Sequence, residues 1–106
     1  MLGEFKQYHW NSPNGSPAGG STSGLGFCIS WQNGGLGRGP DRSEPNGAFV
    51  ETIIAAAKGR LEHFQASGLS CEYNAVAIMH LERALEALDR RTKDREARDV
   101  EGTHRP

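Results

Sequence analysis

The sequence is poor in the residues that normally build a protein core. Leucine, isoleucine, valine and phenylalanine supply only 19 of the 106 residues, and alanine supplies 11 more. Intrinsically disordered chains combine such a deficit with a large net charge, whereas this chain has a formal net charge of −1. The composition therefore indicates a folded chain with a thin core that something else completes.

Other absences exclude whole classes of protein. No apolar run reaches the roughly 18 residues that a membrane-spanning helix needs, and residues 1–10 lack the apolar stretch of a secretion signal. The two cysteines, Cys28 and Cys71, form no disulfide framework, so free thiols in a reducing cytoplasm are expected. The four histidines lie far apart and have no spacing typical of a catalytic triad or a metal site. We therefore predict no catalytic residue, no metal ligand and no cofactor.

Composition divides the chain near residue 47. The first 47 residues hold 11 of the 14 glycines, whereas the remainder holds 19 of the 25 charged residues. Alternation of apolar and polar residues predicts short strands over residues 5–10 and 27–32, and a third over residues 36–38. Residues 11–24 contain Pro, Asn-Gly and Gly-Gly signals and are interpreted as a flexible loop.

From residue 46 the apolar period becomes that of a helix. One helix is predicted over residues 46–66, with Asn46 as its N-cap, and a second over residues 70–98, with Ser70 as its cap. Gly68 lies in the short connection, so the two helices form an antiparallel hairpin. The apolar stripes that carry this prediction are Val50, Ile53, Ile54, Ala57, Leu61 and Phe64 in the first helix, and Asn74, Ala77, Ile78, Leu81, Leu85 and Leu88 in the second.

The predicted fold class is α+β within a single domain of residues 1–106. A small N-terminal antiparallel β-sheet with Gly/Pro-rich loops (residues 1–45) precedes the long two-helix hairpin, and a tail follows over residues 99–106. A hairpin and a few strands cannot bury both stripes, and the alanine-rich segment 55–57 allows close approach of another helix. We therefore predict a homo-oligomer in which hairpins pack on hairpins.

Two arginines of the second helix interrupt an otherwise ordinary charged surface. Acid-before-base pairs at i,i+4 are typical of a solvated helix, but Arg91 and Arg95 are like charges at this spacing. Both are expected to continue the apolar line of the leucines, at its buried edge. Two roles explain these arginines equally well. In the first, they form ion pairs with Asp94 and Asp99; in the second, their two guanidinium groups converge on a bound anion.

Three further features have both a structural and a functional interpretation. The glycine-rich run at residues 34–39 is similar to a phosphate-binding loop but lacks its Gly-Lys-Ser/Thr signature, so a turn is favoured. Phe64 and Asn74 flank the hairpin connection, which is expected to bring them near each other. A core aromatic and a helix-start side chain bonded to backbone are the ordinary roles, while base stacking and a polar base contact are the functional ones.

The second half of the chain resembles the phage Thoeris anti-defence 1 family. The resemblance rests on EYNAVA at residues 72–77, LERAL at 81–85 and above all RTKDREARDVEGTH at 91–104. Asp99 stands where the family usually has glycine. The N-terminal half is similar only in its short strands and its glycine-rich turn.

The resemblance implies a sponge, which is a protein that binds a signal nucleotide without degrading it. The signal would be glycocyclic ADP-ribose (gcADPR), made by bacterial TIR defence proteins in the host cytoplasm, and it would lie between protomers of a dimer or hexamer. CBASS cyclic di- or trinucleotides would occupy a separate site. The site residues implied for gcADPR are Phe64 for adenine stacking, Asn74 for a polar contact, Arg91 and Arg95 for the pyrophosphate, and either Arg38 or Arg42.

Two other functions remain open at this point. A cyclic-nucleotide phosphodiesterase is disfavoured, because no paired carboxylates or nucleophile-base spacing is present. A protein-binding helical hairpin is the other alternative. DNA or RNA binding is not expected, since basic residues outnumber acidic ones by only two between residues 83 and 98.

Overall fold

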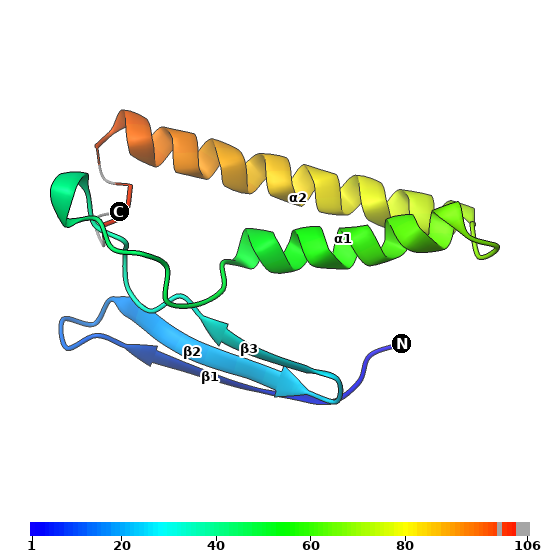
Figure 1. Ribbon diagram of the computed structural model, residues 1–106, viewed down its shortest axis with the longest axis horizontal. Coiled ribbons are helices and arrows are strands. Elements are labelled where there is room, and N and C mark those ends of the chain that lie inside the picture. The colour runs from blue at the N-terminus through cyan, green and yellow to red at the C-terminus, as the bar shows by residue number, and fades with distance from the viewer. Residues whose placement is uncertain (100, 104–106) are drawn as a thin grey trace. The chain divides into compact units, whose positions relative to one another are not determined.

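The computed structural model describes residues 1–99 and 101–103 and divides the chain into two compact units (Figure 1). One unit is Met1–Phe49 with Arg98–Pro106, and the other is Val50–Ala97. The predicted α+β class is confirmed by a 3-stranded antiparallel sheet followed by two long helices. The tail predicted over residues 99–106 is described only at 99 and 101–103, so Val100 and His104 of its motif lie outside the described residues.

The sheet is an antiparallel meander in the order β1-β2-β3. Strand β1 spans Phe5–Asn11, β2 spans Pro17–Gly24 and β3 spans Phe27–Trp31. The strands expected from alternation, β1 and β3, are confirmed. The flexible loop expected over residues 11–24 is wrong, because most of it forms the central strand. The strand expected over residues 36–38 is also wrong, because Gly37 has a φ of 85°, which breaks an extended strand, and a 3-10 turn, η1 (Gly39–Asp41), follows.

Strand β2 has almost no large side chains, and its neighbours cover it instead. An added Cβ at Gly19 would lie 2.9 Å from Trp10 Nε1, and one at Gly24 would lie 2.7 Å from Phe27 Cε1, so aromatic groups of β1 and β3 occupy the space above these glycines. Thr22 is buried, and its hydroxyl accepts a 2.7 Å hydrogen bond from Trp31 Nε1. The strand forms despite poor intrinsic propensity because cross-strand packing supplies what its own residues lack.

The segment before the first helix is bonded to the end of β3. Ala48 forms a parallel bridge with Trp31, and Asn46 Oδ1 accepts a 2.8 Å hydrogen bond from the Asn33 amide. Asn46 N in turn donates to Gln32 Oε1 at 2.9 Å. The prediction that Asn46 caps the helix is therefore wrong, because its carboxamide holds this loop to the sheet and α1 begins four residues later.

The two helices form the predicted antiparallel hairpin (Figure 1). Helix α1 spans Val50–Ala66 and α2 spans Glu72–Ala97. Cys71, rather than the expected Ser70, precedes α2 as its cap, because Asn74 N donates to Cys71 Sγ at 3.4 Å and Ala75 N donates to Cys71 O at 3.3 Å. The Gln65 side chain closes the connection with hydrogen bonds to Cys71 N and O of 3.0 and 3.1 Å.

The contact between the helices is a narrow seam of half-buried side chains. On α2 the seam follows alternating steps of three and four residues, typical of helices packed nearly in line. Its α2 members are Asn74, Ile78, Leu81, Leu85, Leu88, Thr92 and Arg95. Among the described residues no large side chain is fully buried, and Tyr73, Val76 and Met79 are 86%, 43% and 44% exposed. The thin core expected from composition is thus present in the isolated chain.

Candidate functional site

Phe64 and Asn74 both lie at the closed end of the hairpin, where α1 passes into α2. Phe64 is two residues from the end of α1, and Asn74 is the third residue of α2. The double hydrogen bond between Gln65 and Cys71 fastens the backbone between them. Both side chains are half-buried, so each has one part in the seam and one part open to solvent.

The ordinary structural role of Asn74 is present in the structure. Its Nδ2 donates a 3.2 Å hydrogen bond to Leu69 O, which holds the connection against the first turn of α2. Among the described residues nothing donates to its Oδ1. The carboxamide is therefore fixed in place while one acceptor remains open to a ligand donor.

An arginine that the sequence analysis did not single out lies over the Phe64 ring. Arg60 is one helical turn earlier, and its Cζ is 5.0 Å from the ring centroid. The His63 ring is 6.4 Å away and tilted by 51°. Arg60 is exposed, so the closed end of the hairpin presents an aromatic ring with a cation beside it. The i,i+4 spacing from Phe64 is the sequence signal that identifies Arg60.

Arg91 and Arg95 lie toward the other, open end of the hairpin. Arg95 is half-buried on the seam, as expected, but Arg91 is exposed. The expectation that both stand at the buried edge is therefore wrong for Arg91. The seam steps from Leu88 to Thr92, which leaves Arg91 beside it, and Thr92 Oγ1 donates to Leu88 O at 3.2 Å.

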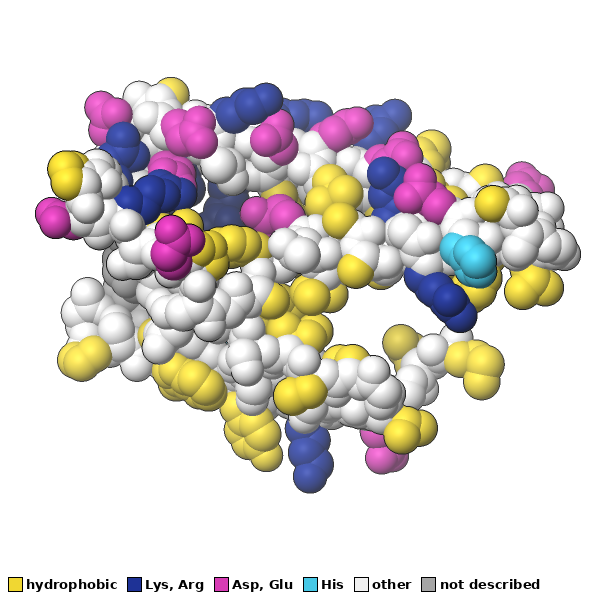
Figure 2. All heavy atoms as spheres, viewed as in Figure 1, with side chains coloured by type: hydrophobic (Ala, Val, Ile, Leu, Met, Phe, Trp, Pro, Cys, Tyr) yellow, Lys and Arg dark blue, Asp and Glu magenta, His cyan; other side chains and the backbone are white. Residues whose placement is uncertain are grey.

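The outer face of α2 is an ordinary charged surface. Lys93 Nζ lies 2.9 Å from Asp89 Oδ2, and Arg90 Nη2 lies 3.8 Å from Glu86 Oε2. The hydrogen bond that Lys93 Nζ donates to the Asp89 carboxylate, and then the negative charge of that carboxylate, raise the pKa of Lys93 above its ordinary value. Basic and acidic side chains alternate along this face (Figure 2). These pairs confirm the solvated face that the i,i+4 spacing predicted.

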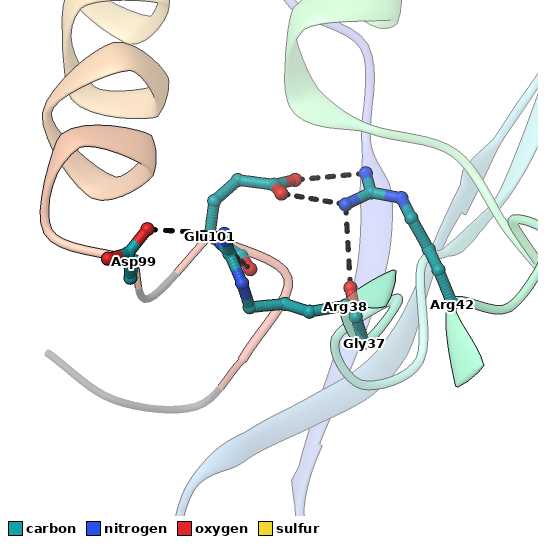
Figure 3. Close-up of polar contacts among 5 residues, drawn as sticks. All are labelled: Gly37, Arg38, Arg42, Asp99 and Glu101. Carbon is teal, nitrogen blue, oxygen red and sulfur yellow. Dashed lines mark hydrogen bonds and ion pairs between the residues drawn. The ribbon is translucent and has the colours of Figure 1, made fainter. Parts of the chain in front are cut away.

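Arg38 and Arg42 lie in the other compact unit, on the glycine-rich loop, and both contact the C-terminal tail (Figure 3). Arg42 Nη1 and Nη2 bind Glu101 Oε2 and Oε1 at 2.7 and 2.9 Å. Arg38 Nη1 donates to Glu101 O at 3.1 Å, and its Nη2 lies 3.5 Å from Asp99 Oδ1. Sequence reasoning missed these partners because 59 or more residues separate them from the arginines.

Asp99 has a backbone conformation that favours glycine. Its φ of 57° is in the left-handed region, and it follows α2 by two residues, where a left-handed residue commonly ends a helix. Glycine would adopt this conformation without the strain that a Cβ introduces. Asparagine and aspartate tolerate the conformation better than other side chains do.

The predicted site residues thus form separate groups within one chain. Phe64 and Asn74 share the closed end of the hairpin, whereas Arg91 and Arg95 lie near the end of α2. Arg91 follows Asn74 by 17 positions of continuous helix, which corresponds to about 26 Å. Arg38 and Arg42 belong to the other compact unit.

Other candidate sites in the described part of the chain offer less. A shallow hollow lies at the edge of the sheet, and its lining, Gly3, Glu4, Phe5, Lys6, Ser23 and Gly24, contains none of the predicted residues. Within residues 1–99 and 101–103 no three His, Cys, Asp or Glu side chains are gathered as a metal ion would need. Over the same residues neither helix is long and apolar enough to cross a membrane.

Comparisons with known proteins match the region that carries these residues. A family model described as "Acb2/Tad1, hairpin domain" matches residues 32–93, which is more than half of the chain. Over 59 residues the chain is 51% identical to a protein of Bacillus phage SBSphiJ7 named "Thoeris anti-defense 1". The aligned segment covers 56% of this chain and 42% of that relative, so the match spans less than half of the relative's length.

Proposed function

Because this chain belongs to the Acb2/Tad1 hairpin family, we propose that it is a phage anti-defence protein that binds gcADPR signals of Thoeris TIR immunity without cleaving them. The name of the Bacillus phage relative supports a role against Thoeris. The motif at residues 91–104 supports the sponge activity by its resemblance to the anti-defence 1 family. Sequestration would take place in the cytoplasm of the infected host, where the signal is made.

The observation that carries the proposal is the separation of complementary groups along one hairpin. An aromatic ring and a carboxamide lie at the closed end, and two arginines lie about 26 Å away along α2. No single chain can bring both ends of its hairpin onto one nucleotide. We therefore propose that the site is composite, with the closed end of one protomer facing the arginines of another.

The chemistry of the two ends is complementary to a cyclic ADP-ribose. Phe64 offers a face for adenine, and the open acceptor of Asn74 suits a ribose hydroxyl or the adenine amino group. Arg91 and Arg95 offer planar forks for the pyrophosphate. A stacked base with two or three charge-assisted phosphate contacts is compatible with a Kd of about 1 nM, or about −12 kcal/mol.

Assembly of several copies is part of the proposal. The incomplete burial of the seam and the exposed Tyr73, Val76 and Met79 leave apolar surface that a second hairpin can cover. A dimer or a hexamer would bring closed and open ends together. Binding of CBASS cyclic di- or trinucleotides at a second site between subunits is a further element of the proposal and rests on the family resemblance alone.

Recovery of the ligand is the direct test of sequestration. Purified protein is incubated with gcADPR, and the free nucleotide is measured by mass spectrometry before and after heat denaturation. We expect depletion of the free nucleotide, followed by quantitative return of intact gcADPR. A cleaved product would instead establish the phosphodiesterase alternative. If calorimetry with gcADPR isomers and cyclic trinucleotides shows no heat, the protein-binding hairpin is favoured.

Variants at each end of the hairpin test the residue assignment. Arg91→Ala, Arg95→Ala and Phe64→Ala are each expected to abolish gcADPR binding while the mass of the oligomer stays unchanged. Arg90→Ala is the matched control, because Arg90 lies on the outer face and pairs with Glu86. Loss of the oligomer in the arginine variants would show that these residues are structural, and wild-type affinity would exclude them from the site.

A further inference from the structure

The C-terminal tail and the glycine-rich loop are in close backbone contact within one compact unit. Gly37 N donates a 2.7 Å hydrogen bond to Gly102 O. An added Cβ at Gly35 would overlap the Gly102 carbonyl, and one at Gly102 would overlap the Gly37 carbonyl. Gly102 also has a φ of 80°, which other residues rarely adopt. Glycine at these positions is therefore required for the two segments to approach this closely.

Glu101 holds both arginines of the loop (Figure 3). Its carboxylate accepts two hydrogen bonds of 2.7 and 2.9 Å from the Arg42 guanidinium group, and its backbone carbonyl accepts one of 3.1 Å from Arg38 Nη1. The Glu101 side chain is only 22% exposed, whereas Asp99 and Glu82 in two other ion pairs of the described residues are 86% and 50% exposed. The carboxylate of Glu101 is therefore better shielded from water than these two. A bidentate, partly buried pair of this kind is among the stronger ion pairs in proteins.

The two arginines differ in what they leave for a ligand. Both terminal nitrogens of Arg42 are engaged by Glu101, and these are the donors that a phosphate would take in a bidentate contact. Arg38 has weaker contacts, one to a carbonyl and one of 3.5 Å to an Asp99 side chain that is 86% exposed. A phosphate can replace the Asp99 carboxylate without disturbing the ion pair between Glu101 and Arg42.

From this difference we infer that Glu101 is a positioning residue: the Glu101–Arg42 clasp fixes the tail on the glycine-rich loop and so holds Arg38 in place for the anionic signal. Arg42 does not contact the ligand. The inference rests on the proposed binding of gcADPR. It assigns the contact with this ligand to Arg38 and not to Arg42. Glu101 lies in the tail after α2, outside the matched residues 32–93.

Calorimetry with gcADPR on a set of variants tests the clasp. We expect Glu101→Gln and Arg42→Gln each to weaken binding by about tenfold, and the double variant to bind no more weakly than either one, because both act through the same contact. Glu44→Gln is the matched control, since Glu44 is exposed in the same unit and has no partner among the described residues. Its affinity should equal that of the wild type.

Charge reversal separates positioning from direct contact. The swapped pair Arg42→Glu with Glu101→Arg is expected to restore affinity to within about threefold of the wild type, because the clasp is rebuilt with its charges exchanged. Circular dichroism checks that the swapped protein folds. Glu101→Asp provides a second test, since its shorter carboxylate keeps the charge but not the bidentate reach, and an intermediate affinity is expected.

Several results would overturn the inference. Tighter binding by Glu101→Gln would mean that the carboxylate competes with the ligand for Arg42. A loss confined to Arg42→Gln, or a folded swapped pair that does not bind, would place Arg42 on the ligand. If Glu101→Gln binds gcADPR with wild-type affinity, the positioning role of Glu101 is rejected and the proposed function stands. If the wild-type protein binds no gcADPR, both the positioning role and the proposed function are rejected.

Discussion

The helical hairpin and the N-terminal unit are stabilised in different ways. In the hairpin, half-buried apolar side chains recur at steps of three and four residues, and the helices meet along this seam. In the N-terminal unit the buried residues are Gly19, Gly20 and Thr22, and the structure depends on aromatic cover, close backbone approach and ion pairs to the tail. A repeating pattern within each helix is enough to specify the first region, whereas the second depends on side chains supplied by neighbouring strands and by the tail.

The largest expected effect of a single substitution is on the seam. Leu85→Asp places a charge without a partner between the helices and should destabilise the hairpin by about 3 kcal/mol. Thermal unfolding followed by circular dichroism at 222 nm reports this loss, because nearly all of the helix is in the hairpin. Leu69→Asp is the control, since Leu69 is 66% exposed and its substitution should change little. Equal effects of the two substitutions would mean that the seam does not stabilise the hairpin.

In the N-terminal unit the strongest effect is expected from a single methyl group. Gly102→Ala combines a positive φ with a steric overlap with the Gly37 carbonyl, and should cost about 2 kcal/mol. Both tryptophans of the chain, Trp10 and Trp31, belong to this unit, so their fluorescence follows its unfolding separately from the helices. If the fluorescence midpoint is unchanged, tail and loop are not held together in solution.

A smaller effect is expected at the hydrogen bond of the central strand. Trp31→Phe keeps an aromatic ring but removes the donor to Thr22 Oγ1, which leaves a buried hydroxyl without its partner, at a cost of about 1 kcal/mol. Denaturant unfolding monitored by the remaining Trp10 measures it. Trp10→Phe, which removes an indole without a hydrogen bond among the described residues, should cost less; the reverse order would contradict the role given to the Trp31 donor.

The smallest effect is expected in the helical connection and has the opposite sign. Gly68 has an ordinary φ and open space around its Cα, unlike Gly102. Gly68→Ala should therefore stabilise the hairpin by about 0.5 kcal/mol, since alanine reduces the entropy of the unfolded chain. A rise in the midpoint of thermal unfolding checks this. A fall would show that Gly68 is required for the turn.

Sequence periodicity predicted the hairpin because its determinants are local. The leucines of α2 face the stripe of α1 across a connection of five residues, so one pattern defines both helices and their pairing. The residue at which each helix begins was harder to predict from the sequence. Asn46 has the chemistry of a cap, yet its carboxamide bonds to Asn33, and this choice depends on where the end of β3 lies.

The central strand and the clasp were missed because each depends on residues from other segments of the chain. Residues 17–24 have little β propensity of their own, and their strand depends on Trp10 and Phe27 from the neighbouring strands. Arg38 and Arg42 were selected as candidate ligand residues without their acidic partners, because Asp99 and Glu101 reach them across the whole hairpin sequence. Phe64, Asn74, Arg91 and Arg95 were placed on their helices by spacing alone, but their distribution over two ends follows from the length of α2.

Mixing two inactive variants tests most directly whether the ligand lies between the closed end of one hairpin and the open end of another. Phe64→Ala retains the arginines, and Arg91→Ala/Arg95→Ala retains the aromatic ring. Neither should bind gcADPR by itself. Co-expressed from differently tagged genes and purified through both tags, the mixed oligomer should recover binding, because one of its composite sites contains Phe64 from one copy and both arginines from the other. A mixed oligomer that forms but binds no gcADPR would contradict a site shared between chains.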